Sequence, residues 1–103
     1  MFQDILAMGS GGGSGTQEVY HDTVSQIQYS WTTGCKLSDI TLFYARSQTY
    51  GQSYIMVLND NGNLVTLGSG DYQTASVDAN GYIVMTNNSA AARATVGEAW
   101  GWK

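Results

Sequence analysis

The chain has 103 residues, of which 43% are hydrophobic and only 12% are charged, and its formal net charge is −4. This length suits one domain with one modest core. The acidic balance argues against electrostatic capture of nucleic acid or of an anionic membrane surface. A single cysteine excludes an internal disulfide framework, and a single histidine without repeated Cys/His spacing argues against a structural zinc site.

The first fifteen residues are expected to form an arm outside the folded domain. Residues 9–15 read GSGGGSG, a flexible composition that packs no structure of its own. This run is either an engineered linker or a natural hinge. It follows a small cluster of apolar side chains that can dock on a neighbouring subunit: Phe2, Ile5, Leu6 and Met8. We therefore predict an arm and hinge over residues 1–15 and a β domain over residues 16–103.

No targeting or membrane-spanning segment is expected. The apolar cluster at the N-terminus is short, and no Lys or Arg precedes Lys36, whereas a secretory signal begins with basic residues. No apolar run approaches the roughly 20 residues that a membrane-spanning helix needs. We expect the protein to be made and kept in a cytoplasm, or released from one by lysis.

From residue 17 onward the dominant pattern is that of β-strands. Ile27, Tyr29 and Trp31 alternate with polar residues, which is the period of a half-buried strand. Residues 39–45 are apolar on both faces, which predicts a central strand covered on both sides, and residues 54–58 are similar.

Further short strands are expected toward the C-terminus, at residues 64–67, 72–77 and 82–86. Residues 89–96 have a helix-forming composition, but the β-branched Thr95 and Val96 leave their structure open.

Two Asn-Gly pairs predict tight turns. Asn61-Gly62 and Asn80-Gly81 each lie between apolar runs, and a type I′ turn needs the positive φ that these residues tolerate. Both pairs are expected to close hairpins with type I′ turns, which together form a meander over about residues 53–87.

The C-terminal residues 98–103 contain two tryptophans, Trp100 and Trp102, which share one face if the segment is a strand. They either close the core as part of the last strand or form an aromatic anchor for a partner or a sugar ring.

No catalytic motif stands out, and we expect no catalytic residue, no cofactor and no metal. His21 is the only histidine, so any Ser–His or Cys–His chemistry must use it, and we expect a surface imidazole instead. Cys35 precedes Lys36, whose ammonium can lower a thiol pKa, but a small buried turn residue is the preferred interpretation.

Three aspartates in or beside the expected turns, Asp60, Asp71 and Asp78, are interpreted as backbone hydrogen-bond acceptors. We do not interpret them as glycosidase carboxylates, and residues 60–63 lack the alternating ligands of a calcium loop.

A short arm beginning with Met, a glycine hinge, a proline-free β domain rich in Ser, Thr, Asn and Gln, and an aromatic C-terminus together resemble the small virion proteins of tailed bacteriophages. The relevant types are decoration, head-fibre, tail and baseplate proteins. The resemblance implies a single small antiparallel β-sandwich or jelly-roll-like domain that assembles symmetrically in the virion. Its partners would be copies of itself and other virion proteins, with no nucleic acid and no membrane.

The leading hypothesis is therefore a non-enzymatic structural subunit held by its arm and its strand edges, with the arm residues, Trp100 and Trp102 binding partners. The alternative is a carbohydrate- or receptor-binding module for a host-surface glycan, with four aromatic side chains as ligand-binding residues: Trp31, Tyr50, Tyr54 and Tyr72. A small enzyme or regulator that depends on His21 is the third hypothesis.

Overall fold

The computed structural model describes residues 17–103 as eight strands, a short 3₁₀-helix and one turn of α-helix. In chain order the strands are β1 (Glu18–Val24), β2 (Ser30–Lys36), β3 (Leu42–Ser47), β4 (Tyr54–Asp60), β5 (Asn63–Ser69), β6 (Gln73–Val77), β7 (Tyr82–Asn87) and β8 (Gly97–Trp102). The 3₁₀-helix η1 spans Leu37–Asp39, and α2 spans Ala90–Arg93.

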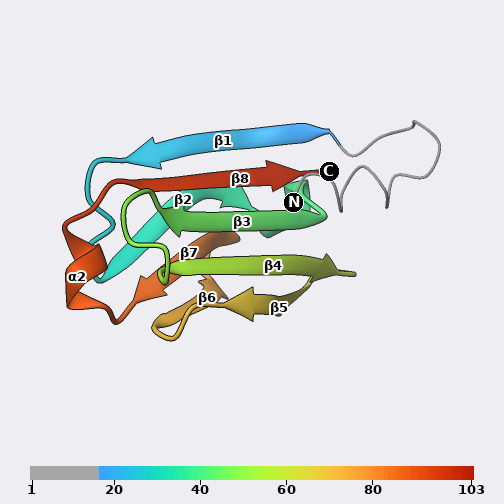
Figure 1. Ribbon diagram of the computed structural model, residues 1–103. Helices are drawn as coiled ribbons and strands as arrows, with labels where there is room; N and C mark the ends of the chain where they lie inside the picture. The colour runs from blue at the N-terminus through green and yellow to red at the C-terminus, as the bar shows by residue number, and fades with distance from the viewer. Residues whose placement is uncertain (1–16) are drawn as a thin grey trace.

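The strands form two antiparallel sheets that pack face to face as a sandwich (Figure 1). The larger sheet has five strands in the order β1-β8-β3-β4-β5, and the smaller has three in the order β2-β7-β6. The expected all-β antiparallel sandwich is thus confirmed. The core lies between the sheets, with Phe43, Ile55 and Val57 from the larger sheet and Ile83 and Met85 from the smaller one fully buried.

Strand β8 is an interior strand of the larger sheet, between β1 and β3. Small residues at positions 97, 99 and 101 face the core, where a Cβ on Gly97 would lie 2.9 Å from Trp31 Cζ3 and one on Gly101 would lie 2.7 Å from Ile40 Cγ2. The alternate positions carry Trp100 and Trp102. These two side chains therefore lie on the outer face of the larger sheet, away from the smaller sheet.

The two Asn-Gly pairs close hairpins, but only one has the predicted turn. Asn61 and Gly62 have φ values of 53° and 93°, as a type I′ turn between β4 and β5 requires. In the turn between β6 and β7 only Gly81 has positive φ, at 89°, and its N–H donates to the Asp78 carbonyl. The predicted type I′ turn at residues 80–81 is therefore wrong. The hydrogen-bonded turn spans residues 78–81, one residue earlier than the predicted turn over residues 79–82, and the Asp78 carboxylate accepts from the N–H groups of Asn80 and Tyr82.

The expected meander over residues 53–87 is also wrong, because the two hairpins belong to different sheets. The chain crosses from β5 to β6 at Gly70, whose N–H donates to the Tyr54 carbonyl. A Cβ on Gly70 would lie 1.6 Å from the Gln52 carbonyl oxygen, so only glycine fits where the two segments cross.

Near the start of the domain the expected alternation holds only in part. Ile27 and Trp31 are buried, but Tyr29 is 55% exposed. Gln28 has a φ of 61°, which turns the chain before β2 begins at Ser30. The alternation of buried and exposed side chains then follows β2 itself.

Two further segments differ from expectation. The expected covering of residues 39–45 on both sides holds only in part, because the smaller sheet covers one face of β3, while on the outer face Leu42 is buried and Tyr44 is half-buried. Within residues 89–96 the helix is limited to one turn, capped by Ser89, whose hydroxyl accepts from the Ala92 N–H. No helix in residues 17–103 is long and apolar enough to cross a membrane.

Candidate functional site

The outer face of the five-stranded sheet carries a row of stacked rings from neighbouring strands. The His21 and Trp100 rings are nearly parallel, at 8°, with centroids 5.2 Å apart. Tyr44 stacks at 5.8 Å from Trp100, and Tyr54 is tilted against Tyr44 at 6.4 Å. We call these four residues the aromatic row.

An acidic side chain beside the aromatic row is held by two basic ones. Glu98 accepts hydrogen bonds from His21 Nε2 at 3.1 Å and from Arg46 Nη2 at 3.4 Å. Partial burial raises the pKa of Glu98, but the hydrogen bonds and charges of His21 and Arg46 outweigh this effect and hold the pKa below its ordinary value. The Arg46 guanidinium also lies 5.4 Å from the centre of the Trp100 ring.

The stacking leaves Trp100 unsuited to bind a sugar face. β1 and β3 flank β8, so His21 and Tyr44 lie on opposite sides of the indole. A sugar that stacks on an aromatic side chain needs a free ring face, whereas both faces of Trp100 are in contact with other rings. The aromatic row thus stabilises the sheet across its strands.

A second row on the same face is aliphatic apart from one indole. Trp102, Leu42, Leu58 and Val65 are successive cross-strand neighbours on β8, β3, β4 and β5. We call these four residues the apolar row. Leu42 and Trp102 are buried, Leu58 is half-buried and Val65 is exposed.

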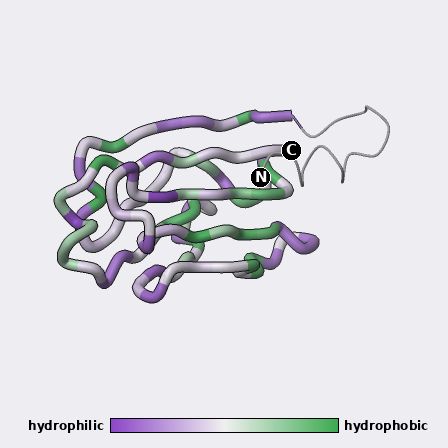
Figure 2. Tube along the Cα trace, viewed as in Figure 1, coloured by the Kyte–Doolittle hydropathy of each residue, from purple (hydrophilic) through white to green (hydrophobic). Residues whose placement is uncertain are grey.

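The outer face therefore changes in polarity along its strands. Glu98 and Arg46 lie near one end of the sheet, the aromatic row crosses its middle, and the apolar row lies near the other end. Figure 2 shows the same change along β3, which is hydrophobic near its start and hydrophilic near its end.

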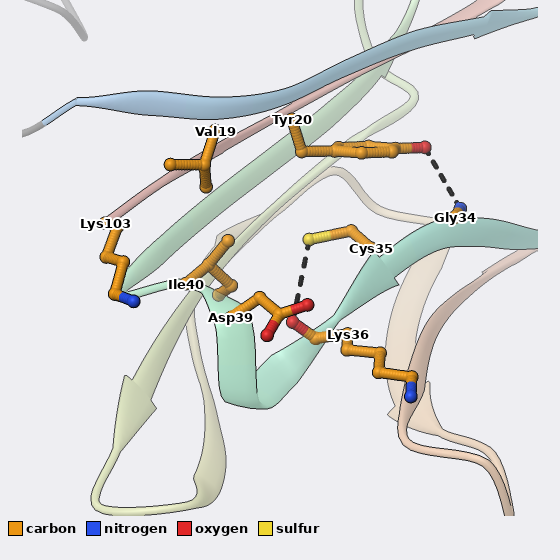
Figure 3. A pocket seen from close by; sticks show the side chains of 8 residues that line it. All are labelled: Val19, Tyr20, Gly34, Cys35, Lys36, Asp39, Ile40 and Lys103. Atoms are coloured by element: carbon orange, nitrogen blue, oxygen red, sulfur yellow. Dashed lines mark hydrogen bonds between the residues drawn. The ribbon is translucent and has the colours of Figure 1, made fainter.

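A cavity of about 270 Å³ lies where β1 meets β2 and η1 (Figure 3). The Tyr20 ring lies above Cys35, and its hydroxyl accepts a hydrogen bond from the Gly34 N–H at 3.1 Å. The remaining lining residues are Val19, Gly34, Lys36, Asp39, Ile40 and Lys103.

The chemistry of this cavity is unfavourable for a thiol nucleophile. Burial, and to a smaller extent the Asp39 carboxylate, raises the pKa of Cys35 to about 11, so the thiol is protonated at neutral pH. The Lys36 ammonium does not lower this pKa and instead lies 5.4 Å from the centre of the Tyr82 ring. Cys35 is buried as expected, but it lies in β2 and not in a turn.

His21 lies in the middle of β1, partly exposed, with its Nε2 engaged by Glu98. Within residues 17–103 no group of three or more His, Cys, Asp or Glu side chains is arranged to hold a metal ion.

The aromatic residues proposed from the sequence as ligand-binding do not converge on one surface. Trp31 was expected to be exposed but is buried in the core, because β2 turns its ring toward β8. Tyr50 lies in the β3–β4 connection with its hydroxyl donating to Gln52, and Tyr72 is exposed before β6. Of the four, only Tyr54 belongs to the aromatic row.

Of the residues proposed for partner binding, Trp100 and Trp102 lie on the outer face, one in each row. Phe2, Ile5, Leu6 and Met8 lie outside the described residues. Sequence analysis did not identify the apolar row or the contacts of Glu98 with His21 and Arg46. The alternation within each strand indicates which residues share a face, but the sequence does not specify the register between strands that are distant in the chain.

Comparisons with protein-family models, with curated proteins and with solved structures found no match. The function of the domain is therefore inferred from its own geometry.

Proposed function

We propose that the protein is a non-enzymatic structural subunit of a larger symmetric assembly, in particular a bacteriophage virion. There it would serve as a capsid decoration, head-fibre or tail component. The observation that carries this proposal is the edge strand β6, which contains no charged residue and pairs with β7 in unbroken register. An uncharged, regular edge strand offers its free backbone groups to another strand.

The surroundings of β6 support the same function. Val77 at its end is exposed, as are the neighbouring Tyr72 and the β5 residues Val65 and Leu67. The nearest carboxylates, Asp71 and Asp78, lie in the turns beyond the ends of β6. This side of the sandwich is therefore suited to strand addition by a second copy.

The β1 edge of the larger sheet differs from the β6 edge of the smaller sheet in the way expected of an edge that stays free. β1 carries charges at Glu18 and Asp22, and its pairing with β8 is interrupted at Val19. Charges and bulges on edge strands prevent pairing with other chains. The β6 and β1 edges belong to the same domain, so the contrast between them favours one specific interface over non-specific association.

The low charge of the chain and the resemblance to small virion proteins support a location in a virion. A surface with few charges has little repulsion between copies, which favours packing in an assembly. In support of a non-enzymatic role, the Cys35 thiol is protonated at neutral pH and His21 is engaged by Glu98.

The test is the native mass of the full 11.1 kDa chain, measured by light scattering after size exclusion. We expect a closed oligomer, such as a trimer, pentamer or hexamer. Thr74→Lys places a charge on the β6 edge and should reduce the mass to that of a monomer. Thr23→Lys is the matched control, because Thr23 is equally an exposed threonine of an edge strand, on β1. A monomeric wild-type chain, or equal effects of the two variants, would contradict the proposed interface.

The alternative function, carbohydrate or receptor binding, has weaker geometric support because its candidate rings do not converge. Tyr72 is exposed and is the residue that best retains this role. A change in tryptophan fluorescence on titration with host glycans would favour the alternative, and no response across a diverse panel would count against it.

A further inference from the structure

The cavity between β1, β2 and η1 lies at a side of the sandwich that the proposed β6 interface leaves free (Figure 3). β1 and β2 are edge strands of the two sheets on this side, whereas β5 and β6 are the edge strands on the other side. Several residues that line the cavity are exposed, among them Val19, Asp39 and Lys103. A ligand can therefore reach the cavity in a single subunit and when the β6 interface is formed.

One wall of the cavity is apolar. Val19 lies where the pairing of β1 with β8 is interrupted, and its side chain is 46% exposed. Ile40 is buried, and the half-buried Tyr20 ring completes the wall. Burial raises the pKa of Tyr20, so this part of the cavity is partly shielded from water. An aliphatic group placed against the wall would be removed from water in the same way.

Two charges of opposite sign lie beside this wall. Within residues 17–103 no hydrogen bond or ion pair engages the Asp39 carboxylate or the Lys103 ammonium, although both residues line the cavity. The third charged group, the Lys36 ammonium, lies 5.4 Å from the centre of the Tyr82 ring. The Asp39 charge acts on the interior of the cavity, since it contributes to the raised pKa of Cys35. The cavity thus offers one free carboxylate and one free ammonium.

We propose that this cavity binds a small zwitterion with an apolar body, of the chemistry of an aliphatic α-amino acid. The ammonium of the ligand pairs with Asp39, and its carboxylate pairs with Lys103. Its aliphatic side chain lies against the wall formed by Val19, Ile40 and Tyr20. A ligand with only one charge would leave one of the two protein charges without a partner in a partly desolvated site.

The volume of the cavity suits a ligand of this size. About 270 Å³ corresponds to about nine water molecules, at about 30 Å³ each. An aliphatic amino acid such as leucine has about the same number of non-hydrogen atoms. This ligand site is separate from the proposed structural role and goes beyond it.

The proposal is tested by NMR titration of the ¹⁵N-labelled full chain at neutral pH, with L-leucine as the probe. Isopentylamine and 4-methylpentanoate are matched probes, because each keeps the aliphatic body of leucine and only one of its two charges. We expect L-leucine to shift the backbone amide signals of Gly34 and Cys35 in a saturable way. The two singly charged probes should bind at least about tenfold more weakly, because each lacks one charge-assisted contact. The amide signal of Gly51, in the β3–β4 connection, should not shift.

Two variants separate this site from general binding to the surface. Asp39→Asn should weaken the binding of L-leucine at least about tenfold, and Lys103→Gln should have a similar effect. Asp60→Asn is the matched control, since Asp60 is also an exposed aspartate but lies at the end of β4, and it should leave binding unchanged. The same spectra show that each variant is folded.

The absence of any shift with L-leucine would overturn the proposal. Equally tight binding of either singly charged probe, or an unchanged affinity in both Asp39→Asn and Lys103→Gln, would also overturn it. None of these outcomes depends on the oligomeric state, so the light-scattering test of the proposed function stands separately.

Discussion

The Trp31 ring in β2 lies directly against Gly97 in β8, so that a Cβ at position 97 would come within 2.9 Å of its Cζ3 atom. The same Cβ would lie 2.8 Å from Ile27 and 2.9 Å from Val24. The glycine is thus the reason that a tryptophan from the smaller sheet fits between the two sheets at this point.

Gly97→Ala should lower the free energy of unfolding by about 1–3 kcal/mol, because the added methyl group overpacks a filled core. The change is measured by urea unfolding of the full chain. Gly68→Ala is the matched control, since Gly68 is also a strand residue but has no atom within 4 Å of a Cβ position. Equal stability of Gly97→Ala and the wild type would mean that the sheets are packed less closely than the structure indicates.

Asn59 connects the β4–β5 turn to η1, and its loss should be costly. Its amide donates to the Leu37 and Ile40 carbonyls at 2.9 Å each, and its Oδ1 accepts from the Gly62 N–H at 2.7 Å. Asn59→Ala should lower the free energy of unfolding by about 2–3 kcal/mol, at about 1 kcal/mol for each hydrogen bond. Asn88→Ala, at an exposed position, should change it by less than about 0.5 kcal/mol. Similar effects in the two variants would contradict the role assigned to Asn59.

Stability should fall in acid partly through Glu98. His21 and Arg46 hold the pKa of Glu98 below its ordinary value, despite partial burial, which acts in the opposite direction. The unfolded chain therefore takes up this proton first as the pH falls, so the contribution of Glu98 is present above about pH 4.3 and is lost through the lower, folded-state pKa.

Glu98→Gln should flatten the pH dependence of urea unfolding in this acid range, whereas Thr32→Ala, at an exposed position that carries no titratable group, should leave the wild-type slope. An unchanged slope in Glu98→Gln would show that its contacts with His21 and Arg46 are not maintained in solution.

The Cys35 thiol should be almost unreactive in the folded protein. Burial and the Asp39 carboxylate raise its pKa to about 11, so very little thiolate exists at pH 8. Alkylation by iodoacetamide at pH 8, followed by mass spectrometry, should be at least about 100-fold slower than in urea. The unfolded thiol ionises near pH 8.5, so the thiol should also reduce stability as the pH rises from there toward 11. Rapid alkylation of the folded chain would mean that the cavity beside Tyr20 admits the reagent and stabilises a thiolate.

The sequence predicted β4, β5, β6 and β7 closely because their signals are local, whereas β1 was not predicted. The type I′ turn at Asn61 was predicted correctly because the turn depends on the backbone preferences of two adjacent residues. The turn at Asn80 was not, because Asp78 binds the backbone and moves the turn along the chain.

The assignment of strands to sheets and faces was beyond sequence reasoning. Trp100 and Trp102 had to share a face of β8. Which face they share depends on β1 and β3, the two strands that pair with β8 and that lie far from it in the chain. A signal for the face was present in the small residues that alternate with the tryptophans, Gly97, Ala99 and Gly101. If the tryptophans faced the core, these small residues would lie on the outer face. The apolar row needs the register of four strands, and no local pattern specifies that.

The hydrogen bonds between Gln17 and Lys103 give the domain an orientation. Both backbone ends leave from one pole, whereas α2 and the β3–β4 connection lie at the other (Figure 1). A subunit anchored through its arm would therefore present this distal pole outward. Gly51, in the β3–β4 connection, is exposed and has open space around its Cβ position, so a peptide inserted there would be displayed at this distal pole.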